Sequence, residues 1–152
     1  MTKTSVSRRL TEREIQAWRS FLRAHSTITR ALETELVDAH ALSLPEYGVL
    51  LTLVEAPEHR LRMTELADQV LLSRSGLTRL VDRMQRGGLV DRFPCPSDAR
   101  GMLAVLTDLG YKRLKASSGT HLRGVRRHVT GQLTATELDQ LQALMTKLTV
   151  SE

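Results

Sequence analysis

The sequence predicts a mainly α-helical fold with one small β-hairpin. Three features lead to this prediction: capping boxes that each begin an amphipathic run, two short helices separated by a brief turn, and two β-prone segments around a turn-rich stretch. The 152 residues are enough for one hydrophobic core. We therefore expect a single domain over residues 1–152.

The N-terminal third should form two helices that begin at capping boxes. Thr11-x-x-Glu14 starts a long amphipathic helix that runs to about His40. Ser43-x-x-Glu46 starts a compact helix that ends near residues 55–57. This second helix is apolar on most sides, so it should be buried. A short extended piece is expected at residues 60–62.

The middle of the chain predicts a helix-turn-helix. Thr64 is expected to cap a short helix whose apolar residues face inward, and residues 71–72 form a brief turn. Ser73 can cap a second helix, Arg74–Arg86, which Gly87-Gly88 ends. Two short helices joined by a tight turn are typical of this motif, although its turn has no glycine here.

A β-hairpin and further helices should follow. Residues 89–93 alternate with a period of two, and residues 102–106 form a second β-prone run. Residues 94–101 are rich in turn formers, which predicts a loop longer than a tight turn. Thr107 is expected to cap the next helix, with helical spacing continuing from Leu122 to Leu133. The Thr134-x-x-Glu137 box then begins a final helix with a heptad-like apolar stripe.

The helix at residues 74–86 has two chemically different faces. One narrow face holds the apolar residues Leu77, Leu80, Val81 and Met84, which should lie against a core. The opposite side presents guanidinium and hydroxyl groups, which can bond base edges in the major groove of double-stranded DNA. The late residues Arg83 and Arg86 are expected to reach phosphates. A solvated polar face is the alternative interpretation, which the flanking helix, glycines and basic hairpin make less favourable.

Composition excludes several other functions. The chain has 22 Lys and Arg against 17 Asp and Glu, a moderate net charge of +5, and 3% aromatic residues, which is too few for a platform that stacks single-stranded bases. A single cysteine excludes an internal disulfide framework, and the histidine spacing predicts no metal site. No catalytic motif or cofactor-binding loop is present, so we expect no enzyme, no catalytic residue and no cofactor. Without an export segment or a long apolar run, we expect a cytoplasmic protein that does not contact a membrane.

The central segment resembles the MarR family of bacterial winged-helix regulators. The resemblance covers residues 11–148 and is strongest over the stretch LLSRSGLTRLVDRMQRGGLVDRFPCPSDARGMLAVLTDLG, residues 71–110. Its most specific parts are the basic helix, Asp98-x-Arg100-Gly, and Leu106-Thr-x-x-Gly110. The segments SLPEYGVLL, from Ser43, and MTELAD, from Met63, match as well.

The resemblance implies a homodimer and a DNA operator with pseudo-palindromic symmetry. It places a winged helix-turn-helix lobe at residues 43–107 and dimerisation helices at residues 11–42 and 108–150. It also implies a repressor modulated by a small effector, which in this family is often an aromatic acid. The residues expected in the major groove are Arg74, Ser75, Gly76, Thr78 and Arg79.

The resemblance also assigns roles in the wing. Arg100, expected at the hairpin tip, is the residue that would enter the minor groove. Asp82 and Asp98 are the carboxylates expected to orient it. Ala99 stands where family members often have a second basic residue, so Arg100 should act largely alone.

Three alternatives stay open at this point. Trp18 is expected in a core or dimer interface, with the lining of an effector cleft as the second possibility. Cys95 could be a redox sensor, but the redox-switched relatives carry their cysteine near the first helix. A winged-helix protein-interaction module without DNA binding is the second candidate function, which the excess of arginine over carboxylate in residues 71–100 makes less favourable.

Overall fold

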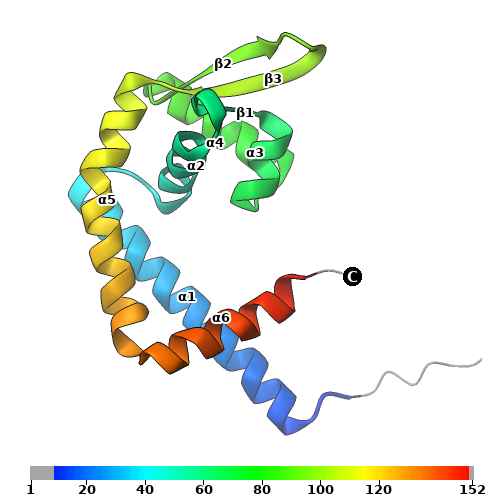
Figure 1. Cartoon of the computed structure of the whole chain (residues 1–152), viewed down its shortest axis with the longest axis vertical. Coiled ribbons are helices and arrows are strands. Elements are labelled where there is room, and N and C mark those ends of the chain that lie inside the picture. Colours follow the sequence, from blue (N-terminus) through cyan, green and yellow to red (C-terminus); the bar gives the residue numbers. More distant parts are fainter. Residues whose placement is uncertain (1–8, 151–152) are drawn as a thin grey trace, which may run out of the picture.

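The structure is a computed structural model that describes residues 9–150, and it has two parts (Figure 1). The first part is a winged lobe made of α2 (Leu44–Glu55), β1 (Arg60–Arg62), α3 (Met63–Val70), α4 (Arg74–Arg86), β2 (Val90–Cys95) and β3 (Asp98–Leu106). The second part consists of the helices α1 (Glu12–His40), α5 (Asp108–His128) and α6 (Ala135–Thr149). The predicted fold class, mainly α with a small β-wing, is confirmed.

Most helix starts lie where the sequence predicts them. The side chains of Thr11, Ser43, Ser73, Thr107 and Thr134 each accept a backbone N–H at the start of their helix. Such caps satisfy donors that have no partner within the helix.

The expected cap at Thr64 is wrong, because α3 begins at Met63 and its N-cap lies two residues before Thr64. Arg62 is the N-cap residue, and its backbone N–H donates to the Glu65 carboxylate at 3.3 Å. Arg62 also pairs with Leu103 in the sheet, so the extended backbone continues as far as this residue. The helix therefore starts directly after the strand, and Thr64 lies within its first turn.

The core of the lobe is formed by the apolar faces of α2, α3 and α4. Leu50 and Leu53 of α2, Leu66 of α3, and Leu77 and Val81 of α4 are all buried. The sheet, in the order β1-β3-β2 with antiparallel pairing, adds Val90 and Ala104 to the same cluster. This packing fixes the orientation of α4 about its own axis, because its apolar face cannot turn toward water without loss of burial.

The hairpin is tighter than the sequence predicts. Its strands reach Cys95 and Asp98, which pair across the turn Pro96-Ser97. The next pair is Pro94 with Met102, so residues 99–101 form a bulge on β3 that has no partner on β2. A bulge absorbs extra residues while the ladder continues, which is why the turn-rich stretch does not form an open loop.

The lobe joins the rest of the chain through α1 and α5, which pack against each other. Gly124 permits the close approach, because a Cβ at this position would lie 2.6 Å from Glu35 Oε2 and 2.7 Å from Leu32 Cδ2. Glu35 Oε1 accepts hydrogen bonds from His128 Nε2 at 2.7 Å and Arg127 Nη1 at 3.0 Å. These contacts, led by that of His128, lower the pKa of the Glu35 carboxyl.

α5 ends at His128, so the expected helical run from Leu122 to Leu133 is wrong. Val129 has φ −133° and ψ −76°, outside the helical region, and a 3-10 turn, η2 (Thr130–Gln132), follows. The chain changes direction there, and α6 leaves at an angle to α5 (Figure 1).

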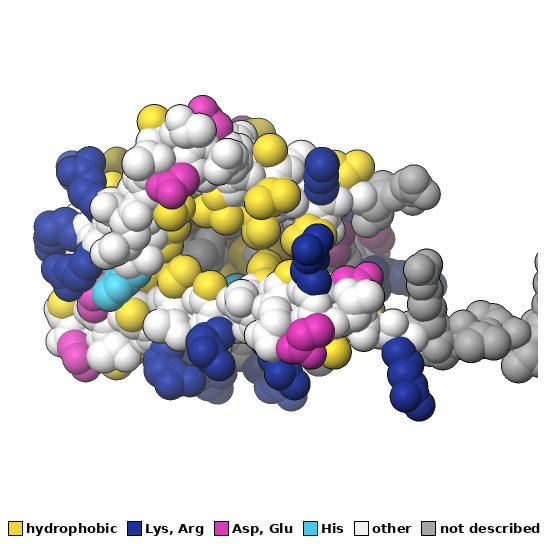
Figure 2. All heavy atoms as spheres, turned by 90° about the horizontal axis from the view of Figure 1, so that it is seen from below, with side chains coloured by type: hydrophobic (Ala, Val, Ile, Leu, Met, Phe, Trp, Pro, Cys, Tyr) yellow, Lys and Arg dark blue, Asp and Glu magenta, His cyan; other side chains and the backbone are white. Residues whose placement is uncertain are grey.

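The helices outside the lobe expose much apolar surface. α6 has no buried residue, and Leu144 and Leu148 are 55% and 69% exposed. On α1, Trp18 is 54% exposed and stacks on Phe21 with ring centroids 6.0 Å apart. Figure 2 shows apolar side chains around a hollow on this side of the molecule, with Lys and Arg mostly at its edges. No helix within residues 9–150 is long and apolar enough to cross a membrane.

The first prediction concerns Gly110 in the first turn of α5. A Cβ at this position would lie 2.1 Å from the Leu89 carbonyl oxygen, which is backbone and cannot move alone. Gly110→Ala is expected to lower the free energy of unfolding by about 1–3 kcal/mol, as overpacking does. The measurement is urea unfolding followed by circular dichroism.

Gly48→Ala is the matched control for this substitution. Gly48 lies within α2, and a Cβ at this position would have nothing within 4 Å, so alanine should raise the free energy of unfolding by about 0.5–1 kcal/mol. Equal effects of the two substitutions would contradict the close packing of Gly110 against Leu89.

Candidate nucleic-acid interface

The helix α4 is held at its start by a local cap. Ser73 Oγ accepts the Gly76 N–H at 3.0 Å, and a Cβ at position 76 would lie 3.0 Å from this same oxygen. Glycine therefore leaves the cap undisturbed, a role that the sequence did not reveal. The Thr78 hydroxyl donates to the Arg74 carbonyl oxygen at 2.8 Å, so its proton is used within the helix.

The turn before α4 depends on a left-handed residue. Leu71 has φ 58° and ψ 40°, and the Leu72 N–H donates to the Ala67 carbonyl oxygen at 3.1 Å. Helices commonly end in this way with glycine, which has no Cβ to clash. Here Leu71 takes the place of the missing turn glycine, and its side chain is 89% exposed.

Four arginines on α4 have no partner among the described residues. The side chains of Arg74, Arg79, Arg83 and Arg86 make no hydrogen bond or ion pair within residues 9–150, and all four residues are exposed. By contrast, the wing residue Arg92 is bound to partners within the protein. Its guanidinium contacts Asp82 Oδ1 at 2.5 Å and donates to Gln85 Oε1 at 2.9 Å. The exposed face of α4 is thus a set of free cations, which suits a polyanionic ligand.

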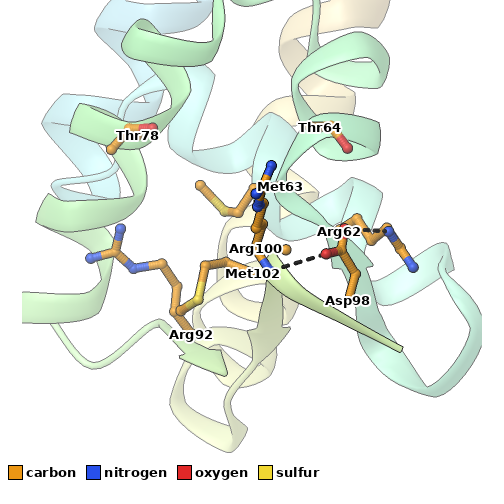
Figure 3. A pocket seen from close by; sticks show the side chains of 9 residues that line it. Arg62, Met63, Thr64, Thr78, Arg92, Asp98, Arg100 and Met102 are labelled. Carbon is orange, nitrogen blue, oxygen red and sulfur yellow. Dashed lines mark hydrogen bonds and ion pairs between the residues drawn. The ribbon is translucent and has the colours of Figure 1, made fainter. Parts of the chain in front are cut away.

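The structure corrects the position of Arg100. It lies in the bulge of β3, between Asp98 and Met102, whereas the hairpin tip is Pro96-Ser97. The Arg100 side chain extends from β3 toward Met63, with Thr78 of α4 on one side and Thr64 of α3 on the other (Figure 3). It borders a hollow of about 350 Å³ between the wing and these helices.

The two carboxylates expected to orient Arg100 make other contacts. Asp82 binds Arg92 instead, because β2 runs beside α4 and brings Arg92 against that helix. Asp98 Oδ2 lies 3.7 Å from Arg62 Nη1, and its Oδ1 accepts the backbone N–H of Arg100 at 3.0 Å. Neither aspartate pairs with the Arg100 guanidinium. Asp98 contacts Arg100 through the backbone N–H instead, whereas Asp82 makes no contact with Arg100.

Arg62 and Arg92 are the residues of this region to which the sequence assigned no role. Both line the hollow with Arg100, and both hold the wing against the helices. The signal available in the sequence was the arginine directly before the Met63-Thr-Glu segment. Its contact with the wing joins residues 35 positions apart, which no local pattern encodes.

Cys95 and Trp18 occupy different surroundings. The Cys95 side chain is buried at the wing, 3.4 Å from Ser97 Oγ, and hydrogen bonding to Ser97 lowers the pKa of its thiol. Trp18 lies in the first half of α1. This half of the helix lies away from the wing (Figure 1). Neither residue lines the hollow between the wing and α4.

Comparison with known proteins agrees with this geometry. A model of the MarR family matches residues 40–101. Sco3205, a MarR family transcriptional regulator from Streptomyces coelicolor solved in complex with DNA, is 37% identical with a TM-score of 0.90, over 95% of this chain and 90% of that chain. AbsC from the same organism, also a MarR family transcriptional regulator, is 34% identical with a TM-score of 0.87, over 93% of this chain and 95% of that chain. The HTH-type transcriptional regulator YkoM of Bacillus subtilis is 28% identical over 97% of this chain and 93% of its own length.

A winged helix-turn-helix whose second helix presents free arginines defines the class of DNA-binding transcriptional regulators. Within this class, sequence identity of 37% to Sco3205, over 90% of that chain, identifies the family. The chain belongs to the MarR family. The resemblance inferred from the sequence is therefore confirmed.

Proposed function

We propose that the protein is a homodimeric repressor that binds a pseudo-palindromic operator in double-stranded DNA and is released by a small ligand. The row of free arginines on the exposed face of α4 is the observation that carries this proposal. The solved DNA complex of Sco3205 supports the choice of DNA as the partner. We place the protein in the cytoplasm, together with the DNA it would regulate.

The contacts with DNA divide by position along α4. Arg74, Ser75, Gly76, Thr78 and Arg79, in the first half of the helix, are proposed to enter the major groove. Arg83 and Arg86, in the second half, bind phosphates, and Arg100 enters the adjacent minor groove. A narrow minor groove attracts arginine because it concentrates negative potential.

The second prediction separates base contacts from phosphate contacts. Arg79→Ala is expected to lose about 1–3 kcal/mol of binding free energy on the cognate operator and to relax the preference at one position per half-site. Arg86→Ala should weaken binding to all sequences alike and reduce the slope of log K against log salt concentration by about one. The measurement is fluorescence anisotropy over a salt series, with an operator selected from random DNA.

Loss of only non-specific affinity in both variants would contradict the groove assignment. A wild-type protein that selects no sequence from the random pool would instead favour the protein-interaction module.

The dimer is proposed to form through α1, α5 and α6, with residues 11–42 and 108–150 as the dimerisation segments and residues 43–107 as the DNA-binding lobe. The support is the exposed apolar surface of these helices, which a second copy would remove from water. On α6, Leu138, Leu141, Met145 and Leu148 share one face.

The third prediction tests this interface. Leu148→Asp is expected to weaken the dimer, because the interface would then bury a charge. Ala143→Asp is the matched control, since Ala143 lies on the opposite side of α6 and is exposed. Sedimentation equilibrium at micromolar concentration should show a monomer–dimer shift for the first variant only. A monomeric wild type that still binds the operator tightly would contradict the proposal.

A groove between the two parts of the molecule is the proposed effector site. It has a volume of about 570 Å³, within the usual range for small ligands. His25, Ser26, Thr29, Arg30 and Glu33 line it from α1, and Leu44, Pro45 and Leu72 line it from the lobe. Trp18 is not among these residues, so we do not retain it as a contact in this groove.

The chemistry of the groove fits a small organic anion with an apolar body. Arg30 offers a cation, whereas Glu33 is already used, because its Oε2 accepts the Leu44 N–H at the start of α2. Leu44, Pro45 and Leu72 supply apolar contacts. Leu72 directly precedes the cap of α4, so a ligand here would change how α4 sits relative to the dimer helices.

The fourth prediction concerns this groove. Benzoate derivatives are expected to raise the dissociation constant of the operator complex for the wild type, and Arg30→Ala should abolish the response through loss of a charge-assisted hydrogen bond. Arg23→Ala is the control, because Arg23 is exposed on α1 but does not line the groove. A full response in the Arg30→Ala variant would show that the effector binds elsewhere.

A further inference from the structure

Arg62 makes a long-range connection from the base of α3 to the tip of the wing. It is the last residue of β1 and the N-cap residue of α3, so its backbone is fixed by the sheet and the helix. Its Nη2 donates to Ser97 Oγ at 2.8 Å, and its Nη1 lies 3.7 Å from Asp98 Oδ2. One guanidinium therefore contacts two consecutive residues at the turn of the hairpin.

The connection continues to Arg100 through Asp98. The second oxygen of that carboxylate, Oδ1, accepts the backbone N–H of Arg100 at 3.0 Å. Arg100 lies in the bulge at residues 99–101, where β3 has no pairing with β2. At Arg100 the backbone of β3 has no partner on β2, and the Asp98 carboxylate supplies a hydrogen bond in its place.

We propose that Arg62 is a positioning residue for the wing, which holds the hairpin tip so that Arg100 is presented to the minor groove. This proposal rests on the proposed DNA binding and names a further residue that determines its specificity. The wing is held separately at its base, where Arg92 contacts Asp82 and Gln85 of α4. The base is also fixed by the pairing of β3 with β1, so the contacts of Arg62 add an attachment at the tip, which limits pivoting of the hairpin about its base.

The effect of Arg62 should fall on DNA recognition and not on global stability. The side chains of Arg62 and Asp98 are 39% and 47% exposed, and ion pairs with such exposure add little to folding. If Arg62 acts only through Arg100, substitution of Arg62 should not change the affinity for DNA in a variant that lacks Arg100. A direct phosphate contact of Arg62 would persist in that background, so the two roles are separable.

The fifth prediction is a double-mutant cycle. Dissociation constants are measured for the full-length wild type, Arg62→Ala, Arg100→Ala and the double variant, on operators with A·T-rich and G·C-rich flanks at one salt concentration. Arg62→Ala is expected to weaken binding to the A·T-flanked operator roughly fivefold and to lower the ratio of affinities between the two operators. In the Arg100→Ala background, Arg62→Ala should change affinity less than twofold. This is about the error within which the effects of independent substitutions add, so a smaller change counts as no effect.

Two further variants complete the test. Arg60→Ala is the matched control, because Arg60 also lies on β1 but its guanidinium pairs with Glu58 instead of the wing. It should retain the flank preference, and its melting temperature should match that of Arg62→Ala. Asp98→Asn should reproduce part of the loss, since the amide keeps an acceptor for Arg100 but removes the charge facing Arg62.

The outcomes separate this proposal from the one on which it rests. Equal losses for Arg62→Ala with and without Arg100 would overturn it and make Arg62 a direct phosphate contact. An unchanged flank preference in Arg62→Ala, with Arg100→Ala still defective, would also overturn it. If Arg100→Ala itself loses no affinity, the proposed minor-groove contact fails, and if the wild type selects no operator, the proposed DNA recognition fails.

Discussion

The burial of one face of α4 determines most of what the wing and the lobe can do. Leu77, Leu80, Val81 and Met84 are held in the core by α2, α3 and the sheet, so the opposite face must lie outward. Arg79, Arg83 and Arg86 lie on that outward side. Together with Arg74, exposed at the first position of the helix, they find no side-chain partner among the described residues. Packing of the apolar face in the core therefore keeps the arginines of α4 exposed, because the helix cannot bury both its apolar face and its charged side chains.

The arginines around α4 and the wing divide into those whose side chains have no partner among the described residues and those that hold the wing in place. Arg62 and Arg92 pair with acceptors of the protein, at the tip and at the base of the wing. Their charges are partly neutralised, and their geometry is fixed. The arginines of α4 and Arg100 retain their full charge for an external anion. A count of basic residues therefore describes such a surface poorly, because affinity for an anionic ligand depends on how many cations have no partner within the protein.

The long helices link this surface to the rest of the molecule. α1 packs on α5 through Gly124 and the contacts of Glu35, so the two helices should move together. The groove beside Arg30 lies where α1 meets α2 and the turn at Leu72, one residue before the cap of α4. A ligand there would act on the orientation of two rigid parts, which is the ordinary physical basis of a ligand-dependent change in affinity.

The sequence by itself determined most of the helix starts and the buried face of α4, because capping and hydrophobic periodicity are local patterns. It also determined the family, through the order and spacing of its motifs. Local patterns misplaced the cap of α3 and the tip of the hairpin, since strand pairing with β3 extended β1 to Arg62 and carried the ladder to Cys95. Only the tertiary structure decided the partners of Asp82 and Asp98. Those partners, Arg92 and Arg62, come from other elements, and an ion pair depends on distance in space, which chain folding sets and sequence spacing does not.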